Sequence, residues 1–184
     1  EIGVGDDAVW MDMAPPTDGP TFSEEEQGAL YAAYGLSLAD RPEGLEPQAV
    51  STGLMDILLP VRDLATLDKA VQNEAEVTRL SEHYNVVGVH MFCSHTPDAV
   101  AHCRNFAPLY AIPEEAATGT SNGALTYYLF RRGLIQAGAD NRFVQGEKMG
   151  KPSEILSRIT EDNGSVKVRV GGRALITLKC ELMG

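Results

Sequence analysis

The feature that most constrains the fold is the run from Ala124 to Phe130, which is apolar on nearly every side. A helix on the surface of a protein keeps a polar face, so a helix of this composition must be surrounded by the rest of the domain. Residues 118–123, which precede it, are mostly small or carry hydroxyl groups. The sequence therefore predicts a buried helix that begins in a small, hydroxyl-rich loop.

Alternating residues predict the strands that surround this helix. Apolar residues alternate with basic ones from 166 to 170, and a period of two resumes from 174 to 182. Gly171 and Gly172 lie between the two runs and can supply the positive φ of a tight turn, which predicts a β-hairpin. A second hairpin is predicted from residue 2 to residue 13. Further strands are predicted at 54–61, 85–94 and 101–107.

Two more helices are predicted from their capping residues. Ser23 and Glu26 form a capping box at the start of a helix that ends near Gly35. Asp63 caps another helix, whose apolar stripe continues through Val71 to Leu80. Loops are predicted at 15–20 and 36–49, which are rich in proline and glycine. Mostly antiparallel strands with about three helices indicate an α+β domain.

Length and charge exclude several classes of function. The chain has 184 residues, which suits one domain. Its 26 acidic and 15 basic residues give a formal net charge of −11, which disfavours a nucleic-acid partner. No apolar run reaches the roughly 20 residues needed to span a bilayer, so no membrane partner is expected.

Cysteine usage and the first residues bear on the compartment. Cys93, Cys103 and Cys180 are an odd and widely spaced set, which favours reduced core cysteines and a cytoplasmic setting. The chain begins at Glu1 without an initiator methionine, a basic start or an apolar signal segment. We therefore expect that further sequence precedes this chain.

The start of the buried helix is a candidate anion site. Free backbone N–H groups and the helix dipole favour a negative ligand there, and Gly119 and Gly123 allow close approach to the backbone. Thr120 or Ser121 can cap the helix or bind a ligand. The alternative is a buried helix with an ordinary cap and nothing bound, and the residues alone leave both interpretations open.

Histidines and cysteines do not form a metal site in this pattern. His90 and His95 are five residues apart on a predicted strand and point to opposite faces. Cys93 shares a face with His95, but two ligands are too few for zinc. His102 and Cys103 are adjacent and also face apart, which disfavours a nucleophilic pair. No metal and no cofactor are expected.

Several ordered motifs resemble the PhzF-like isomerase family. Together they cover nearly the whole chain, and the ordered set is far more specific than any single motif. The stretches that carry the resemblance are Ser51-Thr52-Gly53-Leu54, Arg104-Asn105-Phe106-Ala107-Pro108, Glu114-Glu115-Ala116-Ala117-Thr118-Gly119-Thr120-Ser121-Asn122-Gly123, Gln145-Gly146 followed by Gly150-Lys151-Pro152-Ser153, and Val168 to Leu182.

The resemblance implies a diaminopimelate-epimerase-type fold. In that fold each of two lobes is a strongly curved, mostly antiparallel sheet wrapped around a central buried helix, and the active site lies between the lobes. Residues 1–184 would form the C-terminal lobe, without the N-terminal one. The implied reaction is a cofactor-independent proton transfer, an isomerisation or epimerisation of a small carboxylate-bearing molecule.

The resemblance also implies the site residues. Glu115 falls where the family has a site Asp, and Thr120 falls where it has a site Ser, so these two are the candidate catalytic residues. Glutamate in place of aspartate lengthens the side chain by one methylene, and Ala116 replaces the family's proline. The candidate substrate-binding residues are Thr118, Gly119, Thr120, Ser121 and Asn122.

One family element has no counterpart in this sequence. The family's general base is a glutamate close after an Asn-Pro segment in the first lobe, and no such segment occurs here. Proton abstraction from carbon needs a base within hydrogen-bond reach. We therefore expect this chain to be inactive alone and to need the missing lobe or a second copy of itself as a partner. The alternative function is a non-catalytic domain that binds a carboxylate or associates with itself.

Overall fold

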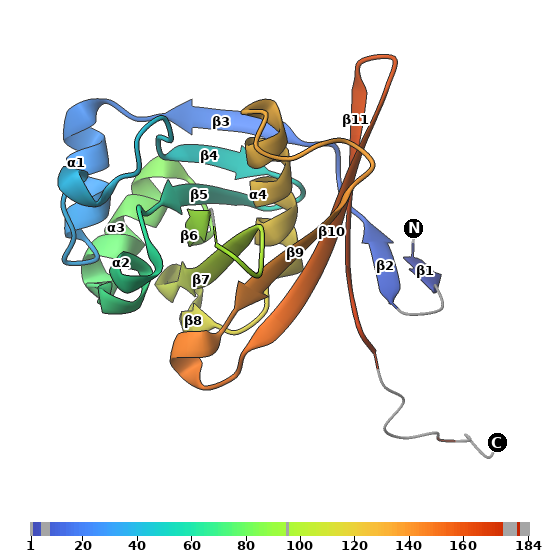
Figure 1. Cartoon of the computed structure of the whole chain (residues 1–184). Helices are drawn as coiled ribbons and strands as arrows, with labels where there is room; N and C mark the ends of the chain where they lie inside the picture. The colour runs from blue at the N-terminus through green and yellow to red at the C-terminus, as the bar shows by residue number, and fades with distance from the viewer. Residues whose placement is uncertain (1, 5–7, 95, 175–179, 181–184) are drawn as a thin grey trace.

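One sheet holds the strands of this protein together. The computed structural model describes residues 2–4, 8–94, 96–174 and 180, and these residues form eleven strands and four α-helices (Figure 1). The strands are β1 (Ile2–Val4), β2 (Val9–Asp12), β3 (Thr17–Thr21), β4 (Gln48–Ser51), β5 (Met55–Pro60), β6 (Gly88–Ser94), β7 (Ala101–Ala107), β8 (Ile112–Glu115), β9 (Asp140–Gln145), β10 (Ser153–Asp162) and β11 (Ser165–Gly172). The helices are α1 (Glu24–Ala32), α2 (Leu64–Lys69), α3 (Glu74–Tyr84) and α4 (Gly119–Arg131), with 3₁₀ turns η1 (Leu38–Asp40), η2 (Pro108–Tyr110) and η3 (Glu147–Met149).

The strand order is β1-β2-β11-β10-β9-β7-β6-β5-β4-β3, and β8 pairs with β7. Every described pairing is antiparallel except β5 with β6 and β7 with β9. Parallel neighbours need a long crossover. Helices α2 and α3 lie on the first crossover, and β8 with α4 lies on the second. The predicted α+β class with a mostly antiparallel sheet is confirmed.

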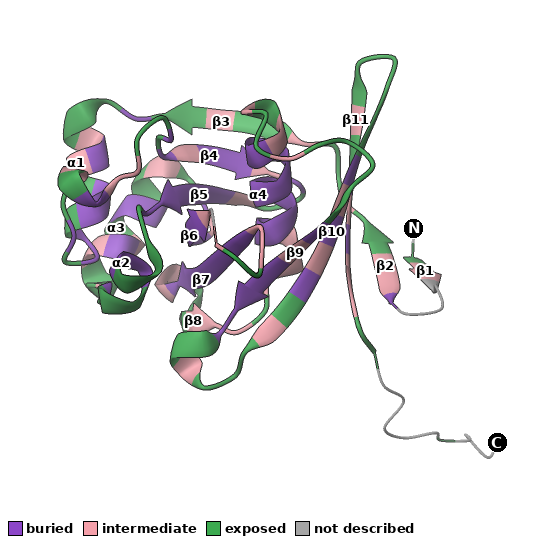
Figure 2. Ribbon diagram, in the orientation of Figure 1, coloured by how far each residue is buried: buried purple, intermediate pink, exposed green. Residues whose placement is uncertain are grey.

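Two cores lie on opposite faces of the central strands. One is formed with α1, α2 and α3, and the other with α4. Side chains of β6 alternate between them, since Met91 belongs to the first core and Phe92 to the second. Figure 2 shows the central strands and α4 as mostly buried, whereas the outer faces of α1 to α3 are exposed.

Helix α4 is the buried helix that the sequence predicts. All of its residues from Ser121 to Leu129 are buried. It packs against β10 and β11 on one side and against β4 and β5 on the other, and it lies between these strands in Figure 1. A helix enclosed in this way needs no polar face, which explains its composition.

The first part of the chain agrees with the prediction in two places and differs in one. Strands β1 and β2 form the expected hairpin, and the capping box of Ser23 and Glu26 is present. The predicted loop at 15–20 is wrong, because Thr17–Thr21 form β3 and pair with β4. Strand β3 is the last in the sheet order, and proline is tolerated on an edge strand or at a bulge.

The helix predicted from Asp63 to Leu80 is two helices. Asp63 caps α2, but the chain breaks after Lys69 and α3 begins with its own cap, Asn73. The backbone N–H groups of Val71 and Asn73 donate to carbonyls at the end of α1, and Val71 is 74% exposed. Contacts with α1 therefore replace the intrahelical bonds that a continuous helix would make.

The C-terminal hairpin also differs from the prediction. Strand β10 turns into β11 through Asn163 and Gly164, which both have positive φ, and the chain does not turn at Gly171 and Gly172. Gly171 lies inside β11 and pairs with Trp10 of β2. A Cβ at Gly171 would approach the Trp10 ring to 2.8 Å, so close packing explains the glycine. Most of the predicted second arm, 174–182, lies outside the described residues.

No helix in the described part of the chain combines the length and the apolar character that a membrane span needs.

Candidate functional site

Three backbone amides are left free at the start of α4. Thr118 occupies the N-cap position, but its side chain does not cap the helix; its Oγ1 donates instead to Glu115 Oε2 at 2.8 Å. Among the residues that the structure describes, no acceptor binds the backbone N–H groups of residues 119–121. Thr118, Gly119 and Thr120 are partly exposed. The amides of Gly119 and Thr120, together with the positive end of the helix dipole, can therefore receive an anion from solvent, whereas Ser121 is buried behind them.

A buried glutamine positions this helix start. Gln145, at the end of β9, is fully buried. Its Oε1 accepts hydrogen bonds from the backbone N of Thr118 (3.3 Å) and from Nδ2 of Asn122 (2.9 Å). Its Nε2 donates to the backbone O of Glu115 (2.7 Å) and to Oγ1 of Thr118 (3.0 Å). One side chain thus holds both the loop and the first turn of α4.

Gly146 lets the chain follow this glutamine closely. It has φ +84°, which favours glycine. A Cβ there would lie 2.8 Å from the backbone O of Ala116 and would collide with the backbone O of Lys151. The Gln-Gly pair of the sequence motif therefore has a structural reason. The glutamine side chain forms hydrogen bonds with the loop before α4, and the glycine has no Cβ that would clash with this loop.

Strand β5 and the turn before it hold the first turn of α4 from the other side. Thr52 Oγ1 donates to the backbone O of Thr120 at 2.9 Å. Ser121 Oγ donates to Asp56 Oδ2 at 2.5 Å, and both side chains are buried. The pKa of Asp56 is raised to about 6: burial is the main cause, the hydrogen bonds from Ser121 and Gly88 oppose it, and the nearby charge of Glu115 adds a smaller rise.

A buried polar cluster lies beneath Asn122. His90 Nδ1 and Asn105 Oδ1 are 3.0 Å apart on neighbouring strands, and burial lowers the pKa of His90 to about 4. Cys103 Sγ lies 3.6 Å from Asn122 Oδ1, and burial raises the pKa of this thiol. At neutral pH the histidine and the thiol are therefore uncharged, which suits a supporting network rather than a nucleophile.

The predicted site residues lie close together in the structure, but they differ in their exposure. Glu115, Thr118, Gly119 and Thr120 are partly exposed around the helix start. Ser121 and Asn122 are buried, and their side chains are engaged by internal partners. Their part in ligand binding, like that of the whole set, stays a prediction.

Gly123 has a different neighbour from the one expected. A Cβ there would lie 2.9 Å from Thr52 Oγ1 and 3.3 Å from the side chain of Met13. Its close approach is therefore to the protein itself and not to a ligand. Gly119 has more room, since its Cβ would meet Val170 at an ordinary contact distance of 3.4 Å.

Sequence reasoning missed the supporting residues. Asp56 and His90 are polar residues within apolar strands, and that contrast is a signal of buried groups that need partners. Gln145 was part of a motif, but nothing in one sequence shows which residues a buried glutamine binds. Asn105 is in the same position, because its partner lies across the sheet.

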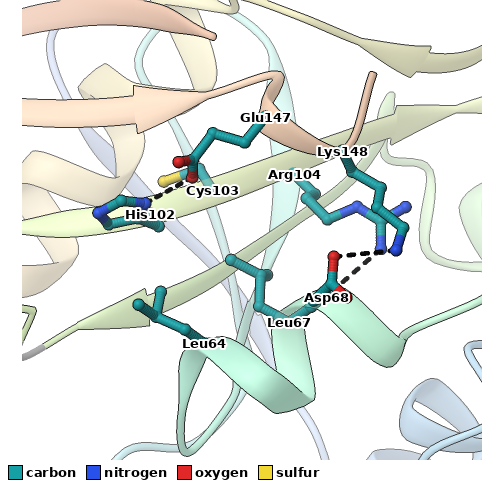
Figure 3. A pocket seen from close by; sticks show the side chains of 8 residues that line it. All are labelled: Leu64, Leu67, Asp68, His102, Cys103, Arg104, Glu147 and Lys148. Carbon is teal, nitrogen blue, oxygen red and sulfur yellow. Dashed lines mark hydrogen bonds and ion pairs between the residues drawn. The ribbon is translucent and has the colours of Figure 1, made fainter. Parts of the chain in front are cut away.

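A separate pocket lies on the opposite face of β7 from α4, between α2 and η3 (Figure 3). Its volume is about 220 Å³. His102 lies between Glu147 (2.6 Å) and Asp98 (3.1 Å); burial lowers its pKa, but these two carboxylates outweigh burial and raise it. Lys148 binds Asp68 at 2.9 Å. The charged groups shown there are paired within the chain.

Among the described residues, no group of three or more His, Cys, Asp or Glu side chains is placed to hold a metal ion. His95, which was weighed as a ligand with Cys93, lies outside the described residues.

Comparison with known proteins places the chain in a family. The model of the family described as phenazine biosynthesis-like protein (PhzC-PhzF) matches residues 4–180. An uncharacterized isomerase of Clostridium acetobutylicum is 31% identical over 173 residues, which are 90% of this chain and 57% of that protein. The trans-2,3-dihydro-3-hydroxyanthranilate isomerase of Pseudomonas chlororaphis is 40% identical over 55 residues, or 30% of this chain and 20% of that enzyme.

A solved structure shows the same fold. The PhzF-family phenazine biosynthesis protein of Bacillus anthracis superposes with a TM-score of 0.82 at 23% identity, covering 94% of this chain and 60% of that one. The chain thus spans somewhat more than half the length of the long relatives that it matches. With the family model matching nearly all of its sequence, this chain belongs to the phenazine biosynthesis-like family, whose named relatives are isomerases.

Proposed function

We propose that this chain is the carboxylate-binding lobe of a cofactor-independent isomerase that moves a proton on a small carboxylate-bearing molecule. The observation that carries the proposal is the set of free amides at residues 119–121, which lie at the positive end of a buried helix. Gln145 and Asp56 hold that helix start from two sides. A carboxylate of the substrate would accept hydrogen bonds from these amides and from the Thr120 hydroxyl.

Glu115 lies beside this site, and hydrogen bonds within the protein restrain both its side chain and its backbone carbonyl. Its Oε2 accepts the hydrogen bond from Thr118 Oγ1, and its backbone O is bound by Gln145. This arrangement suits a group that orients the substrate or relays a proton. Abstraction of a proton from carbon would need a further base within reach of that carbon.

The substrate class follows from a relative and from the site together. The relative from P. chlororaphis is named for an isomerase of a dihydro-hydroxyanthranilate, which carries a carboxylate. The α4 site is suited to one carboxylate. We infer a small cyclic acid as the substrate and residues 1–184 as one lobe, with the base supplied by another lobe.

The binding step can be tested with benzoate, a simple cyclic carboxylate, against benzamide, its neutral analogue. Amide chemical shifts measured by NMR should move at Gly119, Thr120 and Ser121 when benzoate is added, and benzamide should leave them unchanged, because only benzoate supplies the negative charge. Thr120→Val should weaken benzoate binding by about tenfold, the scale of one lost hydrogen bond to a charged group. Thr160→Val, on the exposed part of β10, is the matched control.

Two results would contradict the proposal. Equal binding of benzoate and benzamide would show that the helix start does not recognise the charge. Turnover of a carboxylate substrate by the purified chain, at a rate comparable to that of a long relative, would refute the inference that it lacks a base.

A second candidate is a non-catalytic, self-associating domain. The observation in its favour is the exposure of Ile2 (70%) and Met11 (42%) on the hairpin at one edge of the sheet. Exposed apolar residues at sheet edges favour association with another chain. This candidate would be favoured if the chain binds benzoate at α4 and also associates with itself. The further condition is that a mixture with the missing lobe shows no exchange of substrate protons with solvent.

A further inference from the structure

Asp56 is an ionisable residue buried beneath the helix start. Its residue exposure is 2%, and it lies on β5 between strands β4 and β6. The residue opposite it on β4 is Val50 and the one opposite it on β6 is Gly88, and neither carries a charge. An isolated carboxylate in such surroundings is costly, so its presence calls for a reason.

The contacts of Asp56 tie it to the free amides. Ser121, whose Oγ donates to Asp56 Oδ2 at 2.5 Å, is itself the last residue of the free-amide segment 119–121. Thr52 binds the carbonyl of the neighbouring Thr120. A bound ligand carboxylate would lie on the outer side of the first turn of α4, and Asp56 lies beneath the same turn. Both negative groups would therefore interact with the same helix N-terminus.

The charges around Asp56 do not compensate it. Glu115 from β8 is the charged group that faces it, and this charge has the same sign. His90, two residues beyond Gly88 on β6, is buried and neutral. Within the described part of the chain, no lysine or arginine forms an ion pair with Asp56. Ser121 and the Gly88 amide are the groups that favour its ionised form.

We propose that Asp56 is a positioning residue that takes up a proton from solvent, in a fraction of the molecules near neutral pH, when a carboxylate binds at the N-terminus of α4. The inference rests on the proposed function. Two negative charges within about one helical turn repel each other, and more strongly at a partly buried site than in bulk water. Protonation of Asp56 removes that repulsion, keeps the hydrogen bond from Ser121 and leaves the net charge of the occupied site equal to that of the empty one.

The sign of the pH dependence follows from this linkage. Burial raises the pKa of Asp56 to about 6, so the group is protonated at lower pH and ionised at higher pH. Ligand affinity should therefore be high below this value and should fall as pH rises through it. We expect benzoate to bind about tenfold more weakly near pH 8 than near pH 5.5, from the repulsion of two partly screened charges.

The test is calorimetric titration of benzoate into the full chain in two buffers with different ionisation enthalpies. Wild-type protein should take up a fraction of a proton near neutral pH. Asp56→Asn keeps an acceptor for Ser121 and should abolish both the proton uptake and the tenfold pH dependence. Asp40→Asn is the matched control, because Asp40 is also buried but is hydrogen-bonded to Lys69 rather than to a residue of α4.

Ser121→Ala gives a second measurement that does not depend on the Asp56 variant. Removing this donor disfavours ionised Asp56, so the pH at which benzoate affinity falls should move upward. Benzoate binding without proton uptake, or with the same uptake in Asp56→Asn, would overturn the inference and leave the proposed function standing. Absence of benzoate binding at every pH would overturn both.

Discussion

Gln145 shows how much of the site depends on one side chain. Its amide makes four hydrogen bonds to Glu115, Thr118 and Asn122, and none of its atoms is exposed. A buried polar group with complete partners stabilises a single arrangement, whereas a missing partner leaves several groups unsatisfied. The shape of the helix start is therefore decided from β9, outside the loop that forms it.

We predict that Gln145→Leu lowers the free energy of unfolding by about 2–4 kcal/mol. The leucine has a similar volume but leaves the Thr118 N–H without an acceptor and removes one of the two acceptors of Asn122 Nδ2. Chemical denaturation measures the change. Gln136→Leu, at an exposed position, should alter stability by less than about 0.5 kcal/mol. Equal effects of the two variants would contradict the positioning role of Gln145.

At the scale of elements, two local sequence features near the break between α2 and α3 predict different structures. The stripe from Leu64 to Leu80 is typical of one helix, but Asn73 accepts a hydrogen bond from the Glu76 N–H and starts a second one. The chain between the helices donates hydrogen bonds to the carbonyls of Ala33 and Tyr34, which directly follow α1. The break therefore belongs to the packing of three helices and not to the stripe itself.

The sign of the stability change caused by Asn73→Ala distinguishes two separate helices from one continuous helix. Asn73→Ala should destabilise the protein by about 1 kcal/mol, because it removes the cap of α3. In a continuous helix the same change would be stabilising, since alanine is the better helix former. Thermal unfolding measures the sign, and Val71→Ala, at an exposed position, serves as a near-neutral control.

At the scale of the whole molecule, two strands stand at the edges of the sheet that the described residues form. Strand β1 ends the order on one side and β3 on the other, and the β1–β2 hairpin exposes Ile2 and Met11. Strand β3 carries Asp18 and Pro20, which blunt an edge against pairing. The β1 edge lacks that protection and is the better surface for association.

We predict that the chain forms a homodimer at high concentration. The expected contact includes the β1–β2 hairpin, so Met11→Lys should shift the equilibrium toward monomer, whereas Val71→Lys, at a more exposed position outside the hairpin, should not. Light scattering across a range of concentrations measures the mass. A monomer of 19.8 kDa at every concentration would count against the prediction.

Local patterns accounted for much of the fold. The capping box of Ser23, the β1–β2 hairpin, and strands near β5, β6 and β7 follow from short-range periodicity and capping, which act within a few residues. The buried character of α4 follows from its composition alone. Ordered motifs around Thr118 and Gln145 were enough to indicate the family and to locate the helix start.

Only the tertiary structure decided what each motif residue does. Gly171 and Gly172 are residues typical of a turn, yet they lie in β11, where they pair with Trp10 and Val9 of β2 and where the Trp10 ring packs closely on Gly171. Ser121 carries a hydroxyl that the sequence suggested for ligand binding, yet this hydroxyl donates to Asp56, which is 65 residues away in sequence. Single-sequence patterns report propensities over a few residues, whereas partners across the sheet are set by how the strands are ordered and packed.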